Sequence, residues 1–146
     1  MIEQVEYDVV YNIWINHLWP DRKSPIEKHS AMLMGDQYDL KNYEYEPTFF
    51  IVKDNGTIVG CNSGHKCCDN TYRSRGLYVF PDYRKKGYGK ELLLATINQG
   101  RKENSDAVWS YPRYESWSTY KSAGFELISE WREGETGTNA YCKLVF

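Results

Sequence analysis

The sequence predicts a mixed α/β (α+β) fold with a mostly antiparallel central sheet of about six to seven strands and helices on both faces. Segments with strand composition alternate with segments of helical spacing along the chain. Two strand segments are joined by Asn55-Gly56, a strong signal for a hairpin turn. The 146 residues are most simply one domain, over 1–146, and suffice to bury a core of their own.

The N-terminal third is predicted to hold one strand and two helices. The first six residues favour a short strand. Asp8 is the expected N-cap of a helix that Pro20 ends. A second helix is predicted over 24–35, because this segment opens with a capping box and a proline at the first helical position, and closes on glycine. The polar, tyrosine-rich segment 36–47 is expected to be a loop.

The remaining two thirds are predicted to supply most of the sheet. The expected strands are 48–53, 57–67, about 73–80, 106–111, 125–131 and 139–146. The expected helices are 87–103 and 115–124, and the expected turn between the last two strands is 132–138. Mixed order with a central hairpin implies a mixed sheet.

Composition and charge narrow the class of protein. The net charge of −2 disfavours a protein that coats nucleic acid, which needs a cationic footprint. The N-terminus has acids where a signal peptide has basic residues, and no apolar run approaches the length of a membrane span. We therefore expect a cytoplasmic protein with no nucleic-acid or membrane partner. Whether it forms a homodimer is left open.

The four cysteines do not predict a metal site. Adjacent Cys67 and Cys68 follow His65, but no pair has chelating spacing. The expectation is no metal and reduced, inert thiols on or beside a strand.

The stretch 77–93 carries the clearest chemistry of the sequence. It reads LYVFPDYRKKGYGKELL, which is a strand, a basic turn with two glycines, and a helix start. The first amides of a helix lack intrahelical acceptors and attract anions, phosphates in particular. Gly87 and Gly89 let a ligand approach the backbone. The alternative is a solvated turn whose lysines only aid solubility. The spacing matches neither a Walker loop nor a dinucleotide fingerprint.

Two motifs in this chain resemble those of the GNAT superfamily of acetyl-CoA-dependent N-acetyltransferases. The segment Arg84–Gly89 matches the (Arg/Gln)-x-x-Gly-x-(Gly/Ala) hallmark, after a strand that closes with Val79-x-Pro81. About thirty residues on, Tyr120, Gly124 and Phe125 match the family's Tyr-x-x-x-Gly-Phe element. The order of elements along the chain also agrees. The resemblance implies a sheet that is splayed between its fourth and fifth strands.

The resemblance also implies a coenzyme A site. Backbone amides of the basic loop would hold the pyrophosphate, and the strand at 77–79 would pair with the pantetheine arm, with an N–H near Val79 polarising the thioester carbonyl. The residues implied in cofactor binding are Leu77, Tyr78, Val79, Arg84, Lys85, Lys86, Gly87, Tyr88, Gly89, Lys90, Arg113 and Ser116.

Tyr120 is the catalytic residue that the resemblance implies, as the general acid that protonates the departing thiolate. The alternative for Tyr120 is a core tyrosine of a short helix. The chain departs from the family at Arg113, where many members carry Asn. The strand before the loop also lacks the Glu that many members use as a base. Glu115, His65 and Asp69 are candidate substitutes, and the base stays unassigned.

The acceptor is expected to be a primary amine of a small molecule or a peptide. Aromatic and acidic residues near the N-terminus would suit a cationic amine, or else they close the core and solvate a loop. They are Trp14, Trp19, Tyr38, Tyr43, Tyr45, Asp36, Asp39, Glu44 and Glu46, with Trp117 and Trp131 later in the chain. Acetyl transfer in a ternary complex is the first hypothesis, and an inactive acyl-CoA-binding sensor on the same fold is the alternative.

Overall fold

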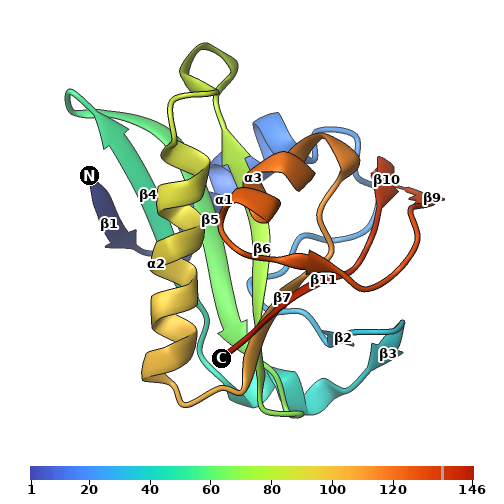
Figure 1. Ribbon diagram of the computed structural model, residues 1–146. Coiled ribbons are helices and arrows are strands. Elements are labelled where there is room, and N and C mark those ends of the chain that lie inside the picture. The colour runs from blue at the N-terminus through green and yellow to red at the C-terminus, as the bar shows by residue number, and fades with distance from the viewer. Residues whose placement is uncertain (136) are drawn as a thin grey trace.

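The computed structural model describes residues 1–135 and 137–146. A seven-stranded sheet forms its centre, in the order β1-β4-β5-β6-β7-β11-β8 (Figure 1). The strands of this sheet are β1 (Ile2–Val5), β4 (Thr48–Asp54), β5 (Thr57–Lys66), β6 (Thr71–Val79), β7 (Ala107–Ser110), β8 (Glu126–Leu127) and β11 (Cys142–Val145). Every recorded pair is antiparallel except β6 with β7. The predicted fold class is confirmed.

Smaller elements complete the fold. Two short hairpins are β2 (Met32–Leu33) with β3 (Gln37–Tyr38), and β9 (Arg132–Gly134) with β10 (Gly137–Asn139). The α-helices are α1 (Tyr7–Ile13), α2 (Tyr88–Lys102) and α3 (Trp117–Ser122). A π-helical turn, η1 (Trp14–Leu18), continues α1, and 3-10 turns cover η2 (Leu40–Glu44), η3 (Pro81–Tyr83) and η4 (Tyr114–Ser116).

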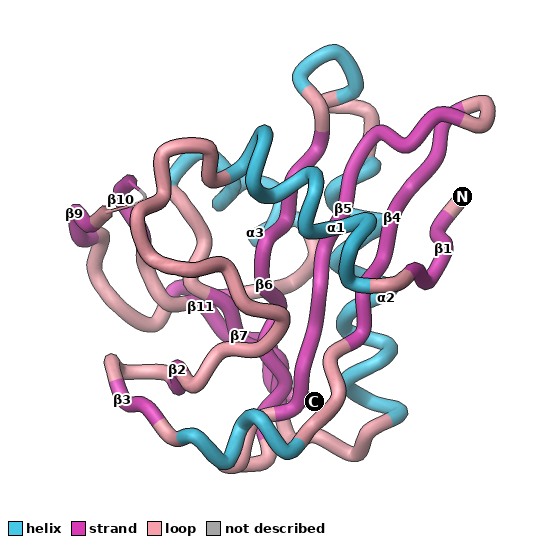
Figure 2. The backbone as a smooth tube through the Cα atoms, turned by 180° about the vertical axis from the view of Figure 1, so that it is seen from behind, coloured by secondary structure: helices cyan, strands magenta, loops and turns pink. Residues whose placement is uncertain are grey.

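The two faces of the sheet carry different helices, as Figures 1 and 2 show from opposite sides. Alternate residues of a strand point to opposite faces. Phe49 and Ile51 of β4 therefore pack with α1 and η1, whereas Phe50 and Val52 pack with Leu92 of α2. Buried aromatic and aliphatic side chains fill both interfaces.

The strands β6 and β7 separate after a short parallel contact. They pair only at Thr71 with Ala107, Tyr72 with Val108, and Arg73 with Trp109. Gly76 adopts φ +80° where the register of β5 with β6 shifts between Cys61 and Ser63. From residue 74 onward, no strand among the described residues pairs with the edge of β6 that faces β7. These are the fourth and fifth strands of the sheet, so the predicted position of the splay is confirmed.

The predicted second N-terminal helix is wrong. Residues 24–31 form no helix, and 32–33 lie in β2. Distant donors take the backbone carbonyls that a helix would use: Tyr7 Oη donates to Ile26 O at 2.9 Å and Arg75 Nη1 donates to Glu27 O. The Glu27 carboxylate accepts from Tyr43 Oη at 2.9 Å instead of reaching back to cap a helix. Tertiary contacts override the local capping signal.

Several predicted boundaries need correction. The first helix begins after Glu6, not at Asp8. Segment 36–47, expected as a loop, contains β3 and η2. The last two strands are shorter than expected, β8 and β11. The turn expected over 132–138 holds the hairpin β9–β10, and Thr136 within it lies outside the described residues. In the part of the chain that is described, no helix is both long and apolar enough to span a membrane.

Candidate active site

A cavity of about 690 Å³ lies between the loop after β6, the start of α2, and α3. We call it the loop cavity. Eleven of the twelve residues predicted to bind the cofactor line it. They are Leu77, Tyr78, Val79, Arg84, Lys85, Gly87, Tyr88, Gly89, Lys90, Arg113 and Ser116. Lys86 is not among the lining residues, and its ammonium lies 5.5 Å from the Tyr83 ring centroid.

The loop is shaped by two residues in the left-handed region. Lys85 has φ +62° and Gly87 has φ +88°. The first amide of α2 with an intrahelical acceptor is that of Glu91, which donates to Gly87 O at 3.0 Å. The amides at 88–90 therefore have no acceptor among the described residues. Free amides at a helix start, with cationic side chains beside them, favour an anionic ligand in this cavity.

Arg84 and Gly89 are held by specific contacts. The Arg84 Nε donates to Val79 O at 2.7 Å, and its guanidinium lies 5.4 Å from the Tyr78 ring centroid. Arg84 thus braces the end of β6 in this structure. A Cβ on Gly89 would come within 2.9 Å of Thr119 Cγ2. The glycine therefore permits close packing of the loop against α3.

A second cavity, of about 430 Å³, adjoins the first. We call it the acceptor cavity. The two share the lining residues Leu18, Leu77, Arg113 and Ser116. Arg113 fixes this junction, because its Nη2 donates to Leu18 O at 2.8 Å. The acceptor cavity reaches the splay of β6 and β7, where Ser74, Ser110 and Tyr120 line it.

Tyr120 lies between the two diverging strands. Its side chain is 2% exposed, and its hydroxyl oxygen lies 3.1 Å from Ser74 Oγ on β6 and 3.0 Å from Ser110 Oγ on β7. Burial raises the pKa of Tyr120 to about 12, because a phenolate is poorly solvated there, and the serine hydroxyls offset part of the rise. The phenol therefore stays protonated at neutral pH.

The candidate bases do not converge on the acceptor cavity. His65 is fully buried, and desolvation followed by the charge of Arg73 lowers its pKa to about 3. Asp69 accepts hydrogen bonds from the amide and hydroxyl of Thr71 in the β5–β6 turn. Glu115 lines the loop cavity and is exposed. None of the three lines the acceptor cavity.

Sequence reasoning missed the charged lining of the acceptor cavity. Arg73 and Arg75 of β6 lie there, with Arg22 and Glu135. The alternation in residues 71–76, TYRSRG, is typical of a strand with one solvated face, so the arginines gave no signal of burial. The α3 side chains Ser118, Thr119 and Ser122 of the loop cavity were also missed.

The four N-terminal acids do not form a cationic-amine pocket. Asp39 caps η2 by accepting from the Lys41 amide, and Glu46 pairs with Lys28 at 3.7 Å. Neither Asp36 nor Glu44 lines the acceptor cavity. Among the aromatic candidates, Trp19 and Tyr38 line it, whereas the remainder do not. The alternative, that most of these residues close the core and solvate a loop, fits the structure.

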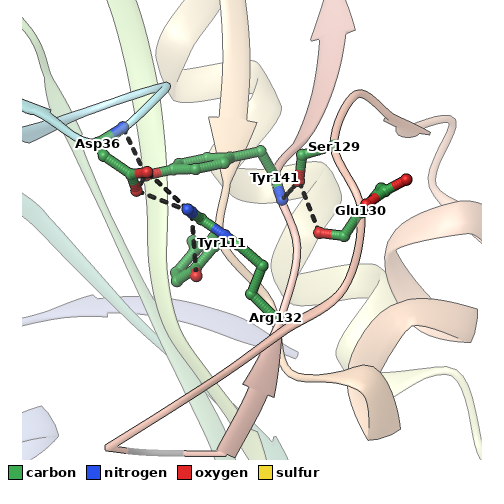
Figure 3. Close-up of polar contacts among 6 residues, drawn as sticks. All are labelled: Asp36, Tyr111, Ser129, Glu130, Arg132 and Tyr141. Atoms are coloured by element: carbon green, nitrogen blue, oxygen red, sulfur yellow. Dashed lines mark hydrogen bonds and ion pairs between the residues drawn. The ribbon is translucent and has the colours of Figure 1, made fainter.

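Asp36 ties the N-terminal segment to the C-terminal half (Figure 3). Arg132 donates to it from both terminal guanidinium nitrogens, Nη1 and Nη2, at 2.6 and 2.8 Å. Tyr141 Oη donates to the same carboxylate at 2.8 Å. Hydrogen bonds from Arg132 and then Tyr141 lower the pKa of Asp36 to about 2. This cluster anchors the β2–β3 hairpin, whose Met32 and Tyr38 line the acceptor cavity.

Replacing Asp36 with asparagine should lower the melting temperature at pH 7. The folded-state pKa of Asp36 is depressed, so its stabilisation is present above the unfolded-state pKa and is lost as the pH falls toward about 2. The melting-temperature difference between wild type and Asp36→Asn should therefore shrink between pH 5 and 3, measured by circular dichroism. Asp54→Asn, whose parent residue ends β4, is the matched control. A difference that stays constant over that range would contradict the expectation.

The four cysteines do not line either cavity. All four thiols are free, and burial raises the pKa of Cys67 to about 11. Over residues 1–135 and 137–146, no group of three or more His, Cys, Asp or Glu is placed to hold a metal ion.

The structure is thus an α/β protein with a splayed mixed sheet and a basic, glycine-bearing loop that opens a helix at the splay. The family model described as "Acetyltransferase (GNAT) family" matches residues 11–125, which is more than half of the chain. The chain belongs to this family of acetyltransferases. The family resemblance stated from the sequence is confirmed.

Solved structures share the fold at low sequence identity. A ribosomal-protein-alanine N-acetyltransferase from Brucella melitensis is 14% identical, with a TM-score of 0.67 over 100% of this chain and 99% of its own. A candidate streptothricin acetyltransferase from Bacillus anthracis, in complex with acetyl coenzyme A, is 16% identical, with a TM-score of 0.66 over 100% and 98%. No curated protein sequence matches this chain. The solved structures establish the fold alone.

Proposed function

We propose that this protein transfers the acetyl group of acetyl-CoA to the amine of a small molecule or peptide, by direct attack in a ternary complex. The observation that carries the proposal is the meeting of two cavities at the splay of β6 and β7, one lined by the free amides of α2 and the other by Tyr120. Membership of the acetyltransferase family supports it.

The loop cavity suits the diphosphate end of coenzyme A. The amides at 88–90 can donate to phosphate oxygens, and Lys85 and Lys90 add formal positive charge beside them. Acetyl-CoA is the cofactor in the Bacillus anthracis structure of the same fold. Coenzyme A is an adenine nucleotide joined to a pantetheine thiol, and its acetyl thioester supplies an activated acyl group. The free edge of β6 at 77–79 would pair with the pantetheine amides, as a strand pairs at a sheet edge.

In the proposed reaction Tyr120 donates a proton where the C–S bond breaks. Burial keeps the phenol protonated and, by raising its pKa to about 12, also makes it a weaker acid than a free phenol. The amine nitrogen forms the N–C bond as the thioester C–S bond breaks, and the thiolate gains a proton from the phenol. The nitrogen loses its proton to solvent, and solvent returns a proton to the phenolate. The phenol is held at the splay by the hydroxyls of Ser74 and Ser110, which keeps its oxygen in one position. No acid is assigned as base. The acceptor cavity is open to water, and we propose that the amine loses its proton to solvent.

A charge reversal at the loop tests the cofactor site. Lys90→Glu should weaken coenzyme A binding by about tenfold, because it replaces an attraction to phosphate with a repulsion. Lys102→Glu is the matched control, since this lysine ends the same helix about 20 Å away. The measurement is calorimetric titration with coenzyme A at fixed salt. Equal coenzyme A affinities for the two variants would contradict the proposal that the loop cavity binds the diphosphate of coenzyme A.

Turnover is tested separately with acetyl-CoA and a panel of primary amines, by detecting the free thiol. The expected result is thiol release that depends on both the amine and the enzyme. Coenzyme A binding without thiol release across small amines and peptides would overturn the proposed activity and leave a binding protein. Failure to bind coenzyme A would overturn the site as well.

A further inference from the structure

Two arginines lie in the wall of the acceptor cavity. Arg73 and Arg75 are two residues apart on β6, so their side chains share one face of the sheet, the face that α1 and the following segment cover. Both line the cavity. Arg75 is only 6% exposed, whereas Arg73 is partly exposed. Arginine is almost never this deeply buried unless a partner offsets its charge.

Aromatic rings and single hydrogen bonds hold the two guanidinium groups in place. Arg75 lies 5.0 Å from the Trp14 ring centroid and 5.4 Å from that of Trp19. Its Nη1 donates to Glu27 O at 2.6 Å. Arg73 lies 4.9 Å from the Trp109 ring centroid, and its Nη1 donates to Ser30 Oγ at 2.8 Å. The side chains are therefore fixed before any ligand arrives.

These contacts leave hydrogen-bonding capacity unused. A guanidinium carries five N–H donors. Within the described residues, each of the two arginines donates one recorded hydrogen bond. The Nε of Arg73 is buried and has no partner there. The two guanidinium groups are therefore held in place while most of their N–H groups have no recorded acceptor among the described residues.

The positive charge of this cavity is not balanced by the described residues that line it. Four arginines line it, Arg22, Arg73, Arg75 and Arg113, against one acid, Glu135. Glu135 is exposed, and its carboxylate accepts from the Lys23 amide at 3.0 Å. The recorded ion pairs among the described residues involve none of the four arginines.

The nearby ionisable groups do not supply the missing anion. Glu27 is the acid that acts on Arg75, and its carboxylate accepts from Tyr43 Oη. Desolvation, followed by the charges of Arg73 and Arg22, lowers the pKa of Arg75 to about 9. Holding two cations together in this wall destabilises the fold. An anionic ligand bound there would offset that destabilisation.

We propose that the acceptor amine also carries a carboxylate, and that Arg73 and Arg75 bind this carboxylate. The inference rests on the proposed acetyl transfer and names its acceptor class, a small amino acid-like molecule. Ser74 lies between the two arginines on β6 and bonds Tyr120, and all four residues line the acceptor cavity. Guanidinium forks match carboxylates in shape and charge. Polycationic acceptors would meet repulsion instead.

Matched substrates test the proposal directly. The probes are the common L-amino acids, each compared with its carboxamide and its decarboxylated amine, with acetyl-CoA and thiol detection. We expect at least one amino acid to react with a kcat/KM about tenfold or more above its carboxamide, as the loss of a charge-assisted hydrogen bond predicts. The proposal is overturned if carboxamides or decarboxylated amines react as well as the acids. In that case acetyl transfer itself still stands.

Variants separate carboxylate binding from a structural role. Arg73→Gln and Arg75→Gln should raise KM for the preferred acid by about tenfold and bring the acid-to-carboxamide ratio toward one. KM for acetyl-CoA should not change. A purely structural arginine would lower activity on both substrates equally and leave the ratio intact, which would overturn the proposal. Arg101→Gln is the control, because that guanidinium lies 4.8 Å from the Phe146 ring centroid and lines neither cavity.

The experiments distinguish failure of the carboxylate proposal from failure of the proposed acetyl transfer. An enzyme that binds coenzyme A and acetylates uncharged amines without discrimination lacks the carboxylate site but keeps the activity. A protein that releases no thiol with any amine lacks the activity, and the acceptor inference falls with it.

Discussion

Replacing Tyr120 with phenylalanine is expected to lower kcat by about 10²- to 10⁴-fold, the usual range for loss of a positioned general acid. The thiolate that leaves would then have to take its proton from water. The ring itself should stay in place, because it packs edge-on against Phe125 at a centroid distance of 5.1 Å. Coenzyme A affinity should therefore remain at the wild-type value. Steady-state kinetics and calorimetric titration measure the two quantities.

The stability cost of the same substitution should be small. The phenol hydroxyl is lost, but Ser110 Oγ still lies 2.7 Å from Ser74 O and can donate there. A loss of about 1 kcal/mol is expected for one buried hydrogen bond. Tyr114→Phe is the control, since Tyr114 is 63% exposed and lines neither cavity. If Tyr120→Phe retains kcat within threefold of Tyr114→Phe, another group protonates the thiolate.

The pH profile offers an independent check on Tyr120. Its pKa is raised to about 12 by burial, so the protonated form persists through neutral and mildly alkaline pH. As pH rises from 7 to 10, kcat/KM for an acceptor without a carboxylate should increase while its amine loses its proton, and kcat should show no decline from loss of the acid. A falling limb of kcat centred below pH 10 would contradict this role.

The parts of the structure that sequence predicted are those set by local chemistry. Asn55-Gly56 forms the expected turn, with φ of +49° and +83°. The helix predicted over 87–103 is α2, because apolar residues recur on one face and glycine precedes it. The loop residues of 84–90 gather at one cavity because a strand, a turn and a helix follow one another without insertion. Such features need no knowledge of distant residues.

The parts that sequence did not predict depend on contacts across the chain. The capping signal at 24–35 was overridden by donors from Tyr7 and Arg75, which are remote in sequence. Arg73 and Arg75 look solvent-facing in sequence because the segment that covers them forms no regular helix of its own. Their burial follows from the path of residues 19–31, which no local pattern encodes. The acceptor cavity could therefore not be predicted from the sequence alone.

Gly76→Ala is expected to destabilise the protein by about 2–4 kcal/mol, the largest effect on stability that we predict. Gly76 has φ +80°, a region that disfavours alanine, and a Cβ there would come within 2.4 Å of three atoms of the Trp14 ring. Trp14 is fully buried and donates from Nε1 to Gly76 O at 2.8 Å. The indole cannot move away without losing this bond and its packing against Phe49.

Gly56→Ala separates backbone strain from steric overlap. Gly56 has φ +83°, nearly the same as Gly76, but no heavy atom beyond its two chain neighbours lies within 4 Å of its Cβ position. Its replacement should cost only about 1 kcal/mol, from the left-handed conformation alone. The free energies of unfolding are compared by urea denaturation of the two variants and wild type. If the two variants lose the same free energy of unfolding to within about 0.5 kcal/mol, Trp14 adjusts freely to the new methyl group. That result would contradict the close packing described here.

Gly76→Ala also tests whether the core is coupled to the acceptor cavity. Trp14 lies under the guanidinium of Arg75, so a displaced indole should also displace that guanidinium. In a Gly76→Ala protein that remains folded at low temperature, KM for the acceptor should therefore rise more than KM for acetyl-CoA. Gly56→Ala should change neither constant, because the β4–β5 turn lines neither cavity. Equal KM values in the two variants would mean that the bulge at Gly76 serves stability alone.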